Sequence, residues 1–257
     1  MPRPLGTSLR PTEREMRAAS EDASRSAVTL TLLQGFRLET DGSTVELPLG
    51  SQRLVAFLAV HRRPLQRLYV AGSLWIDCGE ERANASLRTA LWRLRRLGFP
   101  LVDSSRNQLS LSSSVSVDLQ ESEHHAQEVL RHKGSISPDR RDALLFDGDL
   151  LSDWYDDWVM LERERHRQLR LLALEILCEE LAAAGSYALA VEAGLACIAA
   201  EPLRESAHRA LISAHRAQGN LVEAVRQYRL YHRLAADQLG LEPSAAMQAL
   251  VESLPVQ

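Results

Sequence analysis

Residues 83–98 of the chain spell ANASLRTALWRLRRLG. We predict a helix here that opens at Asn84 or Ser86 and ends near Gly98. At about 100° per residue, its apolar residues gather on one side, which is expected to pack into a core. These residues are Leu87, Leu91 and Leu94, with Ala90 and Leu97 beside them.

The opposite side of this helix carries arginine around a neutral centre. Its members are Ala85, Thr89, Trp92 and Arg96, flanked by Arg88 and Arg93, with Arg95 nearer the boundary. No acidic residue lies between Asn84 and Pro100, whereas a merely solvated helix usually mixes charges of both signs. A helix fits the major groove of DNA, where Arg pairs with guanine or phosphate and Thr meets a thymine methyl. We therefore expect this side to contact double-stranded DNA.

Two alternatives stay open for these side chains. All but one of the 30 basic residues are arginine, a bias that a GC-rich genome would also produce. The alternative for this helix is therefore an arginine-rich side that contacts only solvent. Trp92 either packs on a sugar or base, or against the C-terminal half of the chain. The expected DNA-contacting residues are Ser86, Arg88, Thr89, Trp92, Arg93, Arg95, Arg96 and Arg106.

Upstream of this helix the pattern changes from strand to helix. Alternating apolar residues from Val28 predict a strand, and Asp41-Gly42 predicts a hairpin turn, so the region opens with a small antiparallel sheet. Ser51 is expected to cap a first helix. A second helix is expected over residues 65–75.

Downstream, short apolar stretches predict a closing hairpin. The strands are expected at residues 101–102, 109–112 and 115–117. Between the first two lies a polar tip, residues 103–108, whose Arg106 is placed to enter a minor groove. A sheet, three helices and a hairpin together predict a winged-helix domain of α+β class over residues 28–118.

From about Leu119 the strand pattern ends, and residues 119–254 predict an all-α domain. We expect helices over residues 121–133 and 157–184, separated by a linker at residues 134–138. The long helix is expected to bury Leu161, Leu169, Leu172, Ile176, Leu177 and Leu181.

An internal repeat follows in this domain. Leu177, Leu181, Gly185 and Ala190 recur as Leu211, His215, Gly219 and Ala224, at an offset of 34 residues. A period of about 34 with a glycine turn is typical of tetratricopeptide-like helical hairpins, which stack because one hairpin cannot bury its apolar side alone. Two unrelated hairpins with chance spacing are the alternative.

Composition sets the remaining expectations. With 257 residues, 45% hydrophobic and 25% charged, the chain suits a two-domain globular protein. Residues 1–27 are polar and are expected to form a disordered tail. No apolar run long enough to span a membrane is present, and three scattered cysteines indicate a reducing, cytoplasmic setting. Cys178 and Cys197 are expected to be small buried hydrophobes. We find no catalytic, metal or cofactor motif, and expect no enzyme and no cofactor.

Several motifs resemble the Streptomyces antibiotic regulatory proteins and relatives with a bacterial transcriptional activator domain. The first half resembles an OmpR/PhoB-type winged helix, in residues 47–53 and 87–96. The second half is similar to the family in ALLFDGDLL (143–151), EPLRESAH (201–208) and LAADQLGLEP (234–243). The resemblance covers residues 29–254.

The resemblance implies an activator that binds promoter direct repeats, as a homodimer on DNA, and recruits RNA polymerase with its sigma factor. It implies base contacts at Thr89 and Arg93 and phosphate contacts at Arg88 and Arg95. It also implies that the loop at residues 76–83 faces polymerase. We expect no phosphorelay receiver domain before the winged helix and no ATPase module after the helical domain.

Two positions depart from the family. Trp92 replaces a small or polar residue, and Arg106-Asn107 replaces Gly-Tyr in the wing. These departures support a second hypothesis, a repeat-domain adaptor or ligand-sensing regulator whose winged helix binds DNA weakly or not at all.

Overall fold

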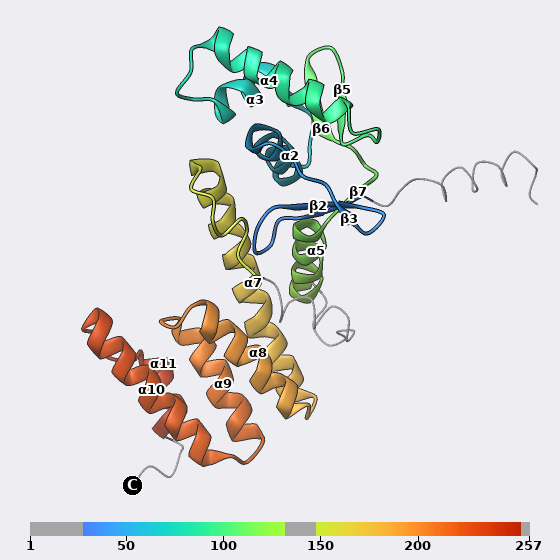
Figure 1. Cartoon of the computed structure of the whole chain (residues 1–257). Coiled ribbons are helices and arrows are strands. Elements are labelled where there is room, and N and C mark those ends of the chain that lie inside the picture. Colours follow the sequence, from blue (N-terminus) through green and yellow to red (C-terminus); the bar gives the residue numbers. More distant parts are fainter. Residues whose placement is uncertain (1–27, 132–147, 253–257) are drawn as a thin grey trace, which may run out of the picture. The chain divides into compact units, whose positions relative to one another are not determined.

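The computed structural model describes residues 28–131 and 148–252 (Figure 1). Packing divides the chain into two compact units. Of the described residues, the N-terminal unit holds 28–30 and Phe36–Val117, and the C-terminal unit holds Thr31–Gly35 and those from Asp118 onward. The predicted tail and linker, and residues 143–147 of the family motif, lie outside the described residues.

Two small sheets frame the N-terminal unit. The strands are β1 (Val28–Thr31), β2 (Arg37–Thr40), β3 (Ser43–Thr44), β4 (Leu65–Gln66), β5 (Val102–Ser104), β6 (Gln108–Leu111) and β7 (Val115–Val117). One sheet has the order β3-β2-β1-β7 and the other β4-β6-β5. The expectation of a purely antiparallel first sheet was wrong, because β7 returns to pair with β1 in parallel. The local sequence of neither strand indicates which distant strand it will pair with.

Three helices complete this unit: α2 (Leu49–His61), α3 (Arg67–Leu74) and α4 (Glu80–Arg95). Ser51 does not cap α2, because Pro48 occupies the cap position and Ser51 is fully buried in the first turn. Residues 65–66 form a strand rather than the start of the second helix. In the same unit, α4 packs against α2 and α3.

The wing is the hairpin β5–β6. Its strands reach further than expected, through Ser104 and from Gln108, so the tip shrinks to residues 105–107. The Ser105 backbone N–H donates to the Gln108 carbonyl at 3.0 Å and closes the turn. Arg67 holds the hairpin from α3: its guanidinium donates to Ser104 Oγ at 3.1 Å, and its backbone N–H to the Asn107 carbonyl at 2.9 Å.

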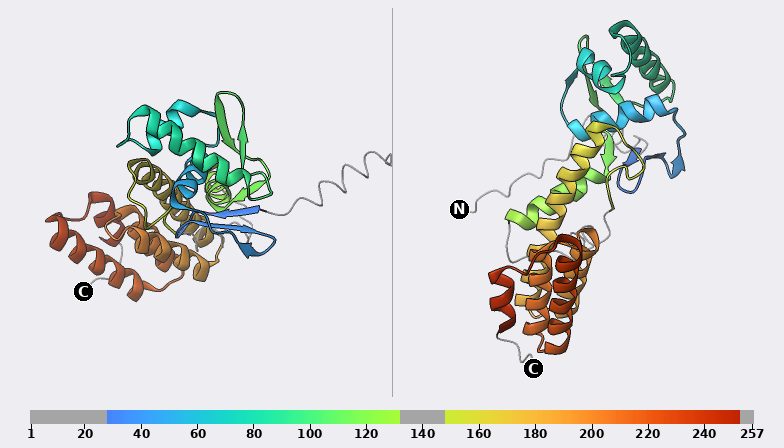
Figure 2. Two further views of the ribbon diagram at one scale, coloured as in Figure 1. Left: turned by 45° about the horizontal axis from the view of Figure 1, so that its top comes forward. Right: turned by 90° about the vertical axis from the view of Figure 1, so that its left-hand side faces the viewer.

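The C-terminal unit is built from helices. They are α5 (Asp118–Arg131), α7 (Asp157–Ala183), α8 (Tyr187–Ala200), α9 (Glu205–Ala217), α10 (Leu221–Leu239) and α11 (Ala245–Glu252). Figure 2 shows α7 to α10 packed side by side as successive hairpins. The first helix starts at Asp118, three residues earlier than expected, and an isolated bridge between Leu33 and Leu150 adds a strand-like contact that the sequence did not indicate.

The repeat is visible in the hydrogen bonds of the two interhelical turns. Gly185 and Gly219 both adopt positive φ, at 77° and 83°, a conformation that favours glycine. The bond from the Ser186 N–H to the Leu181 carbonyl recurs 34 residues later, from Asn220 to His215, with both at 2.8 Å. The α7–α8 and α9–α10 hairpins are therefore equivalent units of a helical repeat.

Burial within α7 corrects two expected core residues. Leu177 is buried, but Leu161 is 71% exposed and Leu172 is also exposed. The buried stripe runs instead through Val159, His166, Leu171, Ala173, Leu174, Leu177 and Cys178. Helical spacing alone fits more than one stripe in so leucine-rich a helix, and the neighbouring helices choose between them.

The two cysteines of the repeat core are buried as predicted. Burial raises the pKa of both thiols, Cys178 and Cys197, to about 12, so they pack as small hydrophobic side chains. Within residues 28–131 and 148–252, no helix combines the length and apolar character needed to cross a bilayer.

Candidate nucleic-acid interface

Helix α4 separates an apolar side from a polar side, as predicted. Its buried residues are Ala83, Leu87, Ala90, Leu91 and Leu94. The helix begins at Glu80 rather than at Asn84 or Ser86, so Glu80 and Glu81 belong to its first turn, where negative charge is favoured by the helix dipole. The run without acidic residues therefore starts one turn into the helix.

The predicted DNA-contacting residues lie on the exposed side of α4. Arg88, Thr89, Trp92, Arg93, Arg95 and Arg96 are exposed, and Ser86 is half-buried. Arg106 is exposed at the wing tip of the same unit. The seven residues on α4 share one side of the helix, and Arg106 lies apart from them on the hairpin.

At the centre of this side, Trp92 is 57% exposed. The guanidinium carbon of Arg96 lies 4.8 Å from the centre of the indole ring. This is a cation–π contact between residues one turn apart. One large aromatic side chain therefore stands on a surface otherwise made of arginine and small residues.

Thr89 has its hydroxyl proton occupied within the helix. Thr89 Oγ1 donates to the Ala85 carbonyl at 3.0 Å, a common arrangement for threonine inside helices. Thr89 therefore offers outward a methyl group and an acceptor oxygen.

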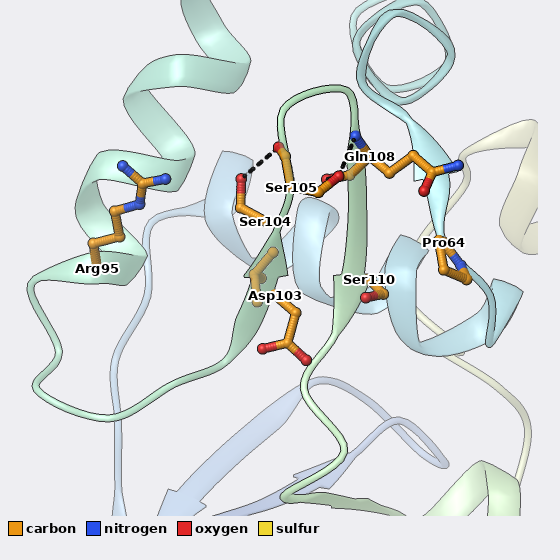
Figure 3. A pocket seen from close by; sticks show the side chains of 8 residues that line it. Pro64, Arg95, Asp103, Ser104, Ser105, Gln108 and Ser110 are labelled. Atoms are coloured by element: carbon orange, nitrogen blue, oxygen red, sulfur yellow. Dashed lines mark hydrogen bonds between the residues drawn. The ribbon is translucent and has the colours of Figure 1, made fainter.

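A polar pocket of about 590 Å³ separates the C-terminal end of α4 from the wing. Figure 3 shows Arg95 on the α4 side and Ser104 and Ser105 on the hairpin side. The Ser104 and Ser105 hydroxyls donate to the Ser105 and Gln108 carbonyls within the hairpin, so Arg95 is the group in this hollow that suits a phosphate oxygen. Asp103 lines the same pocket with opposite charge, so it opposes an anion there.

A second pocket, of about 310 Å³, was not foreseen from the sequence. It joins Gly50 and Ser51 of α2 to Ser86, Thr89 and Arg93 of α4. The first turn of α2 has no acidic residue, so the positive end of the α2 dipole shares this pocket with Arg93. No sequence signal pointed to it, because two segments 35 or more residues apart meet only through the fold.

The loop between α3 and α4 forms a third surface. Ile76 is 78% exposed, and with Leu68, Ala71 and Trp75 it lines an apolar groove of about 380 Å³. Glu80 lines the same groove. An exposed apolar groove with charge at its rim is typical of a protein-binding surface.

Among the described residues, no group of three His, Cys, Asp or Glu side chains is arranged to hold a metal ion. The surface of α4 instead offers arginine, aromatic and hydroxyl groups.

A winged helix with an arginine-bearing exposed helix, followed by stacked helical hairpins, defines the class of transcription regulators rather than a class of enzymes. Residues 117–254 match the family model of the bacterial transcriptional activator domain. The match spans more than half of the chain, so the chain belongs to this family, and the resemblance expected from the sequence is confirmed.

Curated relatives extend the similarity across both units. The chain is 28% identical over 255 residues to regulatory protein AfsR of Streptomyces coelicolor, covering 95% of this chain and 26% of the relative. It is 27% identical over 256 residues to regulatory protein AfsR of Streptomyces griseus, covering 93% and 26%. The chain thus spans about a quarter of the length of these relatives.

A solved structure shares the fold. The chain is similar to Mycobacterium tuberculosis EmbR, solved in complex with a low-affinity phosphopeptide, with a TM-score of 0.72 and 21% identity. The match covers 91% of this chain and 67% of that one. The winged helix followed by a helical-repeat unit is therefore an established arrangement for such a chain.

Proposed function

We propose that this transcription regulator is a sequence-specific DNA-binding activator. It binds direct repeats in promoters as two copies of the chain and recruits RNA polymerase with its sigma factor. Its targets are genes of secondary metabolism, as the family resemblance implies. The chain works in the cytoplasm.

The observation that carries this proposal is the exposed side of α4. Four arginines, Arg88, Arg93, Arg95 and Arg96, stand on a helix whose leucines are buried. The whole chain has a net charge of −4, so this concentration of positive charge is local. A helix of this kind fits the major groove, and its flanking arginines reach the phosphates on either side.

Each side chain has a role in the proposal. Thr89 and Arg93 contact bases, while Arg88 and Arg95 contact phosphates. Ser86, Trp92 and Arg96 complete the interface on α4, and Arg106 enters the neighbouring minor groove from the wing tip. The pocket that joins Arg93 to the start of α2 supports a further phosphate contact there.

Polymerase recruitment is assigned to the α3–α4 loop. Its support is the apolar groove around Ile76, which an activator would offer to a partner protein. The domain limits, 28–118 for the winged helix and 119–254 for the activator domain, belong to the same proposal.

The test is binding to promoter fragments at several salt concentrations, for the wild type, Arg93→Ala, Arg95→Ala and the control Arg233→Ala, an exposed arginine on α10. Arg93→Ala is expected to lose about 1–3 kcal/mol on the specific site. Arg95→Ala should weaken binding to all sequences and lower the salt slope by about 1. The control should match the wild type. Equal affinity for wild type and Arg93→Ala would remove α4 from the interface.

The adaptor hypothesis gives the opposite result. If the winged helix no longer binds DNA, none of these fragments is bound specifically, while a protein or small-molecule partner of the repeat unit remains. Trp92 is the observation that favours this candidate, because a large exposed aromatic side chain also suits a protein interface.

A further inference from the structure

The exposed α4 side carries an apolar strip, although the side as a whole is rich in arginine. At about 100° per residue, Ala85, Thr89 and Trp92 fall within about 60° of one another, and Arg96, one turn beyond Trp92, closes the C-terminal end of the same strip. Arg88 and Arg95 lie on one flank of this strip and Arg93 on the other. In a helix that enters a groove, the centre meets base edges and the flanks meet the two phosphate backbones.

Apart from the indole N–H and the Thr89 oxygen, the surface that Ala85, Thr89 and Trp92 present is carbon. Ala85 presents a methyl group. Thr89 presents a methyl group as well, because its hydroxyl donates to the Ala85 carbonyl. Trp92 presents an indole that is 57% exposed. In the major groove, the base-edge group that matches such a surface is the C5-methyl of thymine.

The indole also has a contact partner on its own helix before any DNA arrives. Arg96 lies 4.8 Å from its ring centre and covers part of it. A side chain already held in one orientation loses less conformational entropy on binding than a mobile one. The same contact places the positive charge of Arg96 next to the apolar strip, where it draws the duplex toward the indole.

We infer that the strip of Ala85, Thr89 and Trp92 reads thymine methyl groups, with Trp92 as the specificity-determining residue. This inference rests on the proposed function. The occupant of the strip is a B-form duplex with thymine in the major groove, since Arg88 and Arg95 on one flank complement a phosphate backbone while Arg93 on the other adds a base contact. An operator read by this helix therefore carries an A·T pair opposite Trp92.

The experiment begins with selection of bound sequences from a random duplex library by the full chain. Each thymine of the selected site is then replaced in turn by uracil, which removes only the methyl group. For the wild type, uracil at one or two positions is expected to lower affinity about three- to fivefold, as loss of one buried methyl group predicts.

Variants assign the effect to the strip. Trp92→Ala should bind the thymine and uracil sites equally, whereas Trp92→Phe should keep the preference for thymine because it retains an aromatic surface. Thr89→Ser keeps the hydroxyl bond to Ala85 and should lose the preference at a neighbouring position. Tyr155→Ala, which removes an exposed aromatic residue outside the winged helix, should behave as the wild type.

The possible failures are distinct. A wild-type chain that enriches a sequence but binds its uracil versions equally well would overturn the inference and leave the proposed function standing. Retention of the thymine preference in Trp92→Ala would also overturn it, because another residue would then contact the methyl group. A chain that binds and enriches no duplex would overturn both.

Discussion

At the scale of single residues, His208 shows how the fold fixes a protonation state. It is fully buried in α9 and lies 4.8 Å from Tyr231, measured between ring centres. Its Nε2 lies 2.9 Å from the Pro202 carbonyl and its Nδ1 2.7 Å from the amide nitrogen of Gln227. Nε2–H donates a hydrogen bond to the Pro202 carbonyl and Nδ1 accepts one from the Gln227 amide, so both hydrogen bonds suit the neutral ring. Burial lowers the pKa of His208.

The first prediction is a loss of stability on acidification. The pKa of His208 is lower in the folded chain than in the unfolded chain, where a histidine has a pKa of about 6.5. Just below that pH the unfolded chain therefore binds more protons than the folded chain, so stability falls as pH falls from 7 to 5. Burial lowers the pKa of His215 in the same direction. Urea denaturation at the two pH values should show a smaller fall for His208→Gln than for the wild type. His232→Gln, on α10, is the control, and an unchanged fall in His208→Gln would contradict the prediction.

At the scale of elements, the close approach of helices in the repeat unit depends on Gly194 in α8. A Cβ placed there would lie 3.1 Å from Leu211 Cβ and 3.3 Å from Cys178 Sγ. Those atoms belong to α9 and α7, so a larger side chain would push on both neighbouring helices. Dense packing leaves little room for them to move.

The second prediction is that Gly194→Val destabilises the repeat unit by about 1–3 kcal/mol, the usual cost of overpacking a core. Ala188→Val, at an exposed position of the same helix, is the matched control and should cost only a few tenths of a kcal/mol, about the difference in helix propensity. Urea denaturation followed by circular dichroism measures both variants. Equal stability of the two would show that α8 has room to shift.

Elements also show what the sequence was able to predict. The two sides of α4 were predictable because burial in a helix repeats every 3.6 residues and its leucines are regularly spaced. The 34-residue repeat was predictable because equivalent turns need glycine at the same place. Neither the start of α4 at Glu80 nor the burial of Ser51 followed from such patterns. The start of α4 had a local signal in Gly79 at the cap and two acidic residues in the first turn, whereas the burial of Ser51 and the pocket shared by α2 and Arg93 depend on which elements the fold brings together.

At the scale of the whole molecule, the short segment Thr31–Gly35 belongs by its packing to the C-terminal unit, although it lies between two strands of the N-terminal unit. The Gln34 N–H donates to the Asp149 carbonyl and the Leu151 N–H to the Leu32 carbonyl, each at 2.8 Å. Asp118, the first residue of α5, accepts from the N–H groups of Leu32 at 2.9 Å and Leu33 at 3.0 Å. One carboxylate therefore fastens a segment that is more than 80 residues away in the chain.

The third prediction follows from that carboxylate. Asp118→Ala leaves the Leu32 and Leu33 N–H groups without their acceptor, and a buried donor that loses its partner costs about 1–3 kcal/mol. Asp118→Asn keeps one carbonyl oxygen, so its loss of stability should be smaller. Asp157→Ala, at the start of α7, is the control for removing an acidic residue from the first turn of a helix. Hydrogen exchange of the Leu32 and Leu33 amides gives the local readout. These amides should exchange faster in Asp118→Ala than in the control, because the Asp118 carboxylate protects them by accepting their hydrogen bonds. Equal protection in both variants would contradict this prediction and would assign the order of the segment to the Leu33–Leu150 bridge instead.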